Sequence, residues 1–136
     1  MIIDTHCHFD MMPYPDMYIQ EQERLGNIVI GMTNLPSHFE MGFPHVKKLK
    51  HIRLSLGMHP QLAEHTHELA KFNEMLDYTS YIGEVGLDFS AHFISTKSTQ
   101  INNLEYVLDL IKGKKKMVSV HSKNAESDVL YLLKKY

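Results

Sequence analysis

The chain lacks the features of secreted, membrane-spanning and nucleotide-cofactor proteins. A single cysteine, Cys7, excludes a disulfide within the chain and fits a reducing compartment. No apolar run approaches the ~18 residues of a membrane helix, and the N-terminus has no signal-peptide pattern. No Gly-x-Gly-x-x-Gly or P-loop pattern follows the first apolar segment, which argues against a nucleotide cofactor. These absences predict a cytoplasmic protein that makes no membrane contact.

An excess of charge of one sign is also missing. The formal net charge is -2, so the surface is not broadly basic and any nucleic-acid contact must be local. The lysine-rich segment 112–116 precedes an apolar strand, which places it on the opposite face from strand ends, as a solvated loop. With 43% hydrophobic and 22% charged residues over 136 positions, the composition predicts one globular domain, 1–136.

Strand-like and helix-like segments alternate along the chain. After a first strand at the N-terminus, further strands are predicted at 27–32, 52–57, 81–85 and 117–121. Helices are predicted at 16–25, 66–78, 96–112 and 124–135, with a helix at 38–50 that Gly42 and Pro44 interrupt. Five strand–helix units in alternation predict an α/β fold with a parallel sheet and right-handed crossovers.

The first strand carries a His-x-His pattern. Side chains alternate with a period of two in a strand, so His6 and His8 share a face, with Asp4 on it, and Cys7 points away. Two imidazoles on one face can coordinate one cation from the same side. The alternative is a buried strand that happens to carry two histidines.

Further polar residues follow the other strands. A carboxylate at the end of an apolar strand is costly to bury without a cation, and the two oxygens of Glu84 could bridge two metals ~3.5–4 Å apart. Each candidate also has a plainer reading, as a helix cap, a core histidine or an ordered loop. These candidates, at the C-terminal strand ends where α/β folds bind ligands, are His59, Glu84, Asp88 and His121.

The residue types suggest roles. Mixed nitrogen and oxygen ligands suit zinc, manganese or related divalent ions. Asp88 could orient a ligand histidine or cap the next turn, and His59 could touch a substrate phosphate or order its loop. Lys123 is either a cation near this face or simply a surface residue. The remaining histidines have no matching partners and are expected at the surface: His38, His45, His51, His65, His67 and His92.

Together these segments resemble the TatD family of metal-dependent deoxyribonucleases. The resemblance rests on Asp4-Thr5-His6-Cys7-His8-Phe9-Asp10, Gly57-Met58-His59-Pro60, Gly83-Glu84-Val85-Gly86-Leu87-Asp88 and His121-Ser122, in the family order and spacing. It implies a TIM-type (β/α)8 barrel and hydrolysis of phosphodiester bonds, often from the 3′ end of single-stranded DNA. It also implies two divalent ions (zinc, manganese or magnesium).

The resemblance assigns roles to individual residues. It implies that His6 and His8 bind one metal, that Glu84 bridges, that His121 binds the second metal, and that His59 lies near the substrate phosphate. Residues 30–38 resemble an antiviral-defence branch, the Qat system, which implies partner proteins in a defence complex. Two positions depart from the family pattern. Lys123 stands where arginine is usual, so the phosphate is held with looser geometry, and Phe89-Ser90 replaces an aromatic pair.

Length is the largest departure. A TIM barrel needs ~250 residues, and this sequence has five of eight units. The family's remaining metal histidine and its essential aspartate belong to later strands. The expectation is therefore an incomplete barrel with open edges at its first and last strands, inactive on its own. Two alternatives stay open: a related metallohydrolase acting on a small phosphoester or amide, and a non-catalytic partial barrel that binds partners.

Overall fold

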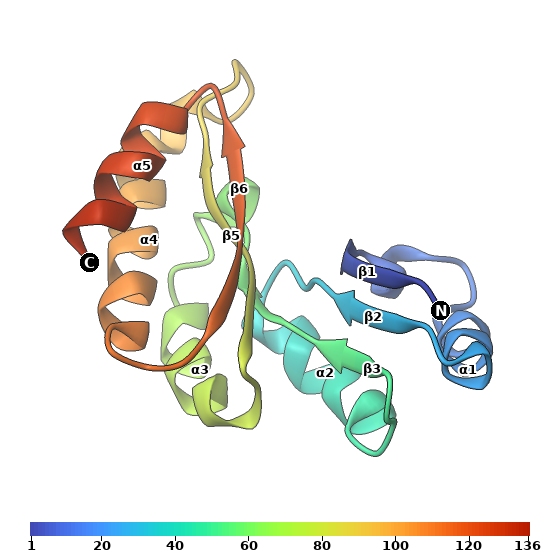
Figure 1. Cartoon of the computed structure of the whole chain (residues 1–136). Coiled ribbons are helices and arrows are strands. Elements are labelled where there is room, and N and C mark those ends of the chain that lie inside the picture. The colour runs from blue at the N-terminus through green and yellow to red at the C-terminus, as the bar shows by residue number, and fades with distance from the viewer.

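A computed structural model describes all residues, 1–136, as parallel strands flanked by helices (Figure 1). The strands are β1 (Ile3–Cys7), β2 (Ile28–Gly31), β3 (Ile52–Leu54), β4 (Leu56–Met58), β5 (Tyr81–Asp88) and β6 (Met117–Lys123). The helices are α1 (Pro15–Leu25), α2 (Pro36–Val46), α3 (Glu68–Met75), α4 (Lys97–Ile111) and α5 (Glu126–Lys135), with 3-10 turns η1 (Phe9–Met11), η2 (Pro60–Leu62), η3 (Leu76–Tyr78) and η4 (Ile94–Thr96). The predicted α/β alternation is confirmed.

The strands form two parallel three-stranded sheets, ordered β1-β2-β3 and β4-β5-β6. The single strand predicted at 52–57 is split at Ser55 into β3 and β4. The Ser55 N–H still donates to the Gly31 carbonyl (2.7 Å), and the Thr33 hydroxyl donates to the Ser55 carbonyl (2.8 Å). The backbone N–H and carbonyl of Ser55 at the break are therefore both paired as the chain passes from one sheet to the other.

Helices cover one side of the strands (Figure 1). The largest fully buried side chains lie between the two layers and include Phe39 of α2, Ile52 of β3, Phe72 of α3 and Val107 of α4. Helix α1 starts with Pro15 at its first turn and ends at Gly26, whose positive φ of 68° makes the left-handed C-cap. The apolar stripes predicted from helical spacing thus face the strands.

The predicted bounds of three elements were wrong. Helix α2 runs unbroken from Pro36 to Val46, because Pro44 falls in its last turn and removes only one hydrogen bond there. Strands β5 and β6 continue to Asp88 and Lys123, three and two residues past the predicted ends. They keep pairing with each other in the register Gly86↔His121 to Asp88↔Lys123. Glu84 and His121 therefore lie inside their strands rather than at the strand ends.

Strands β1 and β6 are edge strands, each paired on one side only. Ile3 in β1 and Met117 in β6 are 59% and 60% exposed, which is unusual for large apolar side chains in strands. The face of the sheets away from the helices is covered by no helix (Figure 1). None of the helices combines the length and apolar character that crossing a membrane requires.

Candidate metal centre

The carboxylate of Glu84, in the middle of β5, lies among four imidazoles. Its Oε2 atom is 3.0 Å from His8 Nε2 and 3.4 Å from His6 Nε2, both from the first strand or the turn after it. The same oxygen is 3.5 Å from His59 Nε2, which follows β4. The other oxygen, Oε1, is 2.9 Å from His121 Nδ1 on β6. Glu84 is only 7% exposed, so its carboxylate is shielded from water and its side-chain polar contacts are with these rings.

His121 links Glu84 to a second buried carboxylate. Its Nε2 atom is 3.0 Å from Oδ2 of Asp88, a residue that is fully buried. That Asp88 oxygen also accepts a hydrogen bond from Gln61 Nε2 (2.9 Å), and the other oxygen accepts from the Ser90 N–H (2.9 Å). The ring is held at both nitrogens, so its orientation toward Glu84 is fixed.

The two N-terminal histidines are anchored differently. His6 Nδ1 is 2.8 Å from the hydroxyl of Ser119 on β6, so its ring spans the opening between the first and last strands. His8 Nδ1 is buried and has no hydrogen-bond partner, which leaves the Glu84 contact as the polar interaction of that ring. A buried unpaired nitrogen carries a free-energy cost, and such costs are accepted mainly at functional sites.

His59 is oriented by its own backbone turn. Its Nδ1 atom accepts a hydrogen bond from the Gln61 N–H (3.2 Å), and the residue is 8% exposed. An accepting Nδ1 carries no proton, so in the neutral ring the proton lies on Nε2. The nitrogen that faces Glu84 is therefore a hydrogen-bond donor in this tautomer.

Both carboxylates at the site are strongly acidic. Burial alone raises the pKa of Glu84, but hydrogen bonds from His59, His121 and His8, together with electrostatic attraction to His59, outweigh it and lower the pKa to about 2. Burial also raises the pKa of Asp88, and hydrogen bonds from Gln61, Ser90 and His121 reverse this and hold it well below its ordinary value. Both groups are thus anions at neutral pH.

Glycines allow the backbone around Glu84 to pack closely. A Cβ on Gly57 would lie 1.7 Å from the Thr33 carbonyl oxygen and 2.9 Å from the Glu84 nitrogen, two atoms that hydrogen-bond to each other (3.1 Å). Gly86 has a positive φ of 145°, and a Cβ there would lie 1.9 Å from the His121 carbonyl oxygen. Only glycine fits these two positions, which bring β5 against its neighbours at the site.

Two predicted site residues are placed differently from the others. Asp4, expected on the face of the histidine rings, accepts a hydrogen bond from the His6 backbone N–H (3.0 Å) instead of from a ring. A register irregularity between Asp4 and Cys7 breaks the strict alternation on which that prediction relied. Lys123 lies at the end of β6 with an exposed side chain that makes no hydrogen bond or ion pair.

The lysine-rich segment is not wholly solvated. Lys116 Nζ donates to the backbone carbonyls of Leu76 (2.7 Å) and Thr79 (2.6 Å). Its ammonium group therefore ties the start of β6 to the end of η3, and the prediction of a purely solvated loop was wrong at this residue. The other lysines of the segment, including Lys115, are exposed.

Sequence reasoning missed three supporting residues. Thr33 follows strand β2, the rule that found the other site residues, and its backbone pairs with Gly83 (3.3 Å) and Glu84 (3.1 Å). Gln61 stands two residues after His59 and holds Asp88. Gln100 is 1% exposed on α4 and bonds both the N–H (2.8 Å) and the carbonyl (2.9 Å) of Asp88. A polar residue on the buried stripe of a helix was the signal for Gln100.

The donor set fits divalent metal ions. Two groups each offer ligand atoms within 4.8 Å of one another, and they share the buried carboxylate: His6, His8 and Glu84 in one, His59, Glu84 and His121 in the other. Imidazole nitrogens with a carboxylate suit zinc and manganese. The histidine held at its far nitrogen by Asp88 matches the usual support of a metal-ligating imidazole.

A parallel α/β fold with histidines and a shared carboxylate at this edge of the strands has the architecture of a metal-dependent hydrolase. The profile of the TatD related DNases matches residues 3–136, and the chain belongs to this family. An uncharacterized metal-dependent hydrolase of Buchnera aphidicola subsp. Baizongia pistaciae is 27% identical over 98% of this chain and 54% of its own length. Another, from Buchnera aphidicola subsp. Acyrthosiphon pisum, is 28% identical over 97% of this chain and 56% of its own. The chain spans about half the length of these relatives.

Proposed function

We propose that this chain carries the N-terminal metal-binding half of a DNase that hydrolyses phosphodiester bonds. The observation that carries the proposal is the placement of Glu84, whose Oε1 atom faces His121 and whose Oε2 atom faces His6, His8 and His59. A carboxylate in that position is suited to join two cations. Family membership supports the hydrolase class.

The proposed centre would hold two divalent ions, of zinc, manganese or magnesium. His6 and His8 would hold one and His121 the other, with Glu84 shared between them. When bound, such ions supply Lewis acidity that stabilises charge developing on a phosphate. Asp88 fixes the His121 ring, and Ser119 fixes that of His6, so these supports keep the ligand nitrogens directed at the centre.

His59 is proposed to contact the phosphate rather than a metal. Its Nδ1 accepts the Gln61 N–H, and a ligand nitrogen needs a free lone pair, whereas Nε2 here carries the proton. An N–H at that atom donates to a phosphate oxygen. Lys123 has a free ammonium at the end of β6 and is proposed to add a second cationic contact to the substrate strand.

We further propose that the five units form part of a TIM-type barrel, and that the substrate is single-stranded DNA degraded from its 3′ end. The parallel order and the outer layer of helices support the barrel. A role in antiviral defence with partner proteins, and a cytoplasmic location, stay predictions.

The test uses the complete protein and a 5′-labelled single-stranded oligonucleotide. We expect metal-dependent shortening from the 3′ end, abolished by a chelator and restored by zinc, manganese or magnesium. A Glu84→Gln variant should be inactive, and an Asp109→Asn variant, changed at an exposed site on α4, should match wild type. Hydrolysis of bis(4-nitrophenyl) phosphate with intact oligonucleotide would instead indicate a small-substrate phosphoesterase.

A further inference from the structure

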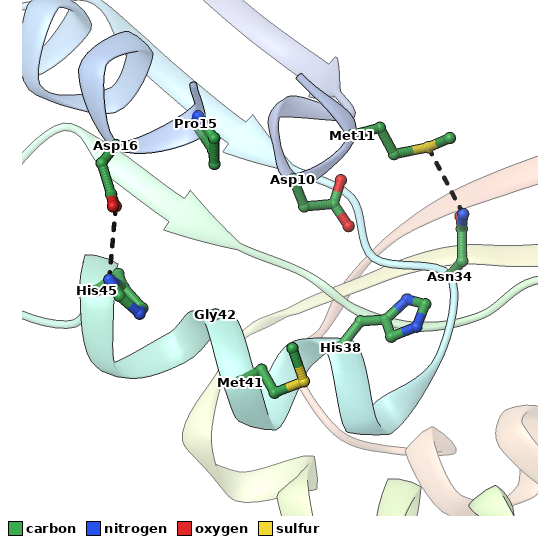
Figure 2. Close-up of a pocket in the computed structure, with 9 residues that line it drawn as sticks. All are labelled: Asp10, Met11, Pro15, Asp16, Asn34, His38, Met41, Gly42 and His45. Atoms are coloured by element: carbon green, nitrogen blue, oxygen red, sulfur yellow. Dashed lines mark hydrogen bonds and ion pairs between the residues drawn. The ribbon is translucent and has the colours of Figure 1, made fainter. Parts of the chain in front are cut away.

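A cavity of about 560 Å³ lies beside the metal centre, between the turn η1 and the helix α2 (Figure 2). Asp10 and Met11 of η1 form part of one wall, and His38 and Met41 of α2 lie on the other. Its volume is in the range of small-molecule sites. The histidines on its wall were expected to be isolated surface residues, but the fold gathers them around a common space.

The cavity is flanked at both ends by side-chain contacts. At one end His45 Nδ1 lies 3.5 Å from Asp16 Oδ1, and at the other Asn34 Nδ2 lies 3.8 Å from Met11 Sδ (Figure 2). These contacts join α2 to the segment before α1. The space between them is therefore a bounded trough.

The trough adjoins the metal centre through the backbone. Asp10 follows His8 by two residues, and the Asn34 carbonyl accepts a hydrogen bond from the His59 N–H (2.8 Å). The two residues at this end of the trough are thus tied to two histidines of the centre.

The lining chemistry excludes phosphate and favours a flat ring. No lysine or arginine lines the cavity, and Asp10 and Asp16 would repel an anion. Met11 and Met41 are 70% and 72% exposed, and their thioethers provide apolar, polarizable walls that favour contact with aromatic rings. The His38 ring lies across the trough from Asp10 (Figure 2).

The exposed polar group of η1 at the end nearest the metal centre is the Asp10 carboxylate. An ionised carboxylate can only accept hydrogen bonds. A ligand with an N–H₂ group would donate to it. Cytosine presents such a group at N4, where thymine has an acceptor oxygen, O4.

We propose that this trough binds the base of the nucleotide next to the scissile bond and prefers a base with an exocyclic amino group, cytosine or adenine, over thymine. The proposal rests on the proposed DNase function. Met11, Met41 and His38 contact the faces of the base, and the amino group donates to Asp10. The preference is set by Asp10, because thymine O4 would face a carboxylate that cannot donate a hydrogen bond to it.

Nucleoside binding to the complete protein tests this without requiring cleavage. Methionine ε-methyl groups are labelled with ¹³C, and 2′-deoxycytidine or thymidine is titrated while the methyl resonances are followed by NMR. We expect saturable shifts of Met11 and Met41 with deoxycytidine, about tenfold weaker binding of thymidine, and no shift of Met117 on β6. Absence of saturable shifts, or equal affinity for both nucleosides, would overturn the proposal.

Two variants locate the preference. Asp10→Asn replaces an acceptor by a group that can also donate, so the affinity ratio between the two nucleosides should fall to about one. His38→Ala, on the opposite wall and exposed, should weaken both nucleosides by a similar factor. His92→Ala, at an exposed site outside the cavity, should keep the wild-type ratio. A wild-type ratio in Asp10→Asn, or unchanged affinities in His38→Ala, contradicts the assignment.

The result separates this proposal from the function on which it rests. Nucleosides contain no phosphodiester bond, so the titration reports on the trough even if the protein cleaves no DNA. If DNA is cleaved but the methyl groups do not respond to either nucleoside, the DNase proposal stands and the base site is rejected.

Discussion

The Nε2 atom of His121 lies 3.0 Å from the Oδ2 atom of Asp88, and this contact spans two neighbouring strands. It fixes the ring whose other nitrogen faces Glu84. Asp88 is itself held by Gln61 and by the backbone N–H of Ser90. The orientation of one proposed metal ligand thus depends on η2, β5 and β6 together.

Asp88→Asn is expected to weaken metal binding without unfolding the protein. The amide cannot supply the negative charge that favours the His121 orientation, and losses of such supports typically cost about 10–100-fold in metal affinity. Zinc affinity of the complete protein, measured by competition with a chelating dye, checks this. Asp109→Asn serves as the control, and equal affinities of the two variants would contradict the prediction.

Glu84→Ala is expected to abolish hydrolysis in the complete protein. Its carboxylate is proposed to separate two cations, and without it they repel each other, so kcat/KM should fall by at least about a hundredfold. Lys115→Ala, in an exposed segment away from the centre, should do little. Initial rates on single-stranded DNA measure both, and comparable losses in the two variants would rule out the assignment.

Glu23 is expected to make stability depend on pH. Its carboxylate accepts the backbone N–H groups of Lys50 (2.9 Å) and His51 (2.8 Å), linking α1 to the start of β3. Burial raises the pKa of Glu23, but these hydrogen bonds and His51 outweigh it and lower the pKa below its ordinary value of 4.5. A lowered pKa means that the contribution is fully present above pH 4.5 and is lost as the pH falls through the folded-state value.

Glu23→Gln should therefore reduce the free energy of unfolding by about 1–2 kcal/mol at pH 7, and by less near pH 3. Urea denaturation at the two pH values measures the difference. Glu64→Gln, at an exposed position, is the control. A loss that is the same at both pH values would show that the charge of Glu23 is not the cause.

The edge strands are expected to make the 136-residue chain associate. β1 and β6 each have one unpaired side, and Met117 and Ile3 are exposed beside them. Unpaired backbone groups cost about 1–3 kcal/mol each when dry and invite pairing when wet. Light scattering should show oligomers, and Met117→Lys should shift the distribution toward monomer. A stable, monodisperse wild-type monomer would refute the argument.

Local sequence patterns by themselves determined the element types and most candidate site residues. The alternation of apolar segments predicted a parallel α/β fold, and the position of polar residues near strand ends selected His6, His8, His59, Glu84, Asp88 and His121. These inferences succeed because strand and helix periods are local properties, and because parallel strands bring the same ends of successive segments to one edge.

Only the tertiary structure decided how these residues relate to one another. In the folded chain, one oxygen of Glu84 contacts His121 and the other contacts His6, His8 and His59. Asp4 accepts a hydrogen bond from a backbone N–H instead of a histidine ring. Gln61 and Gln100 bond to Asp88. The fold also places Asp10 across a cavity from His38. Such contacts join residues far apart in the chain, and they depend on strand register and on close backbone approach at Gly57 and Gly86. No local period encodes these quantities, because they are set by how whole elements pack.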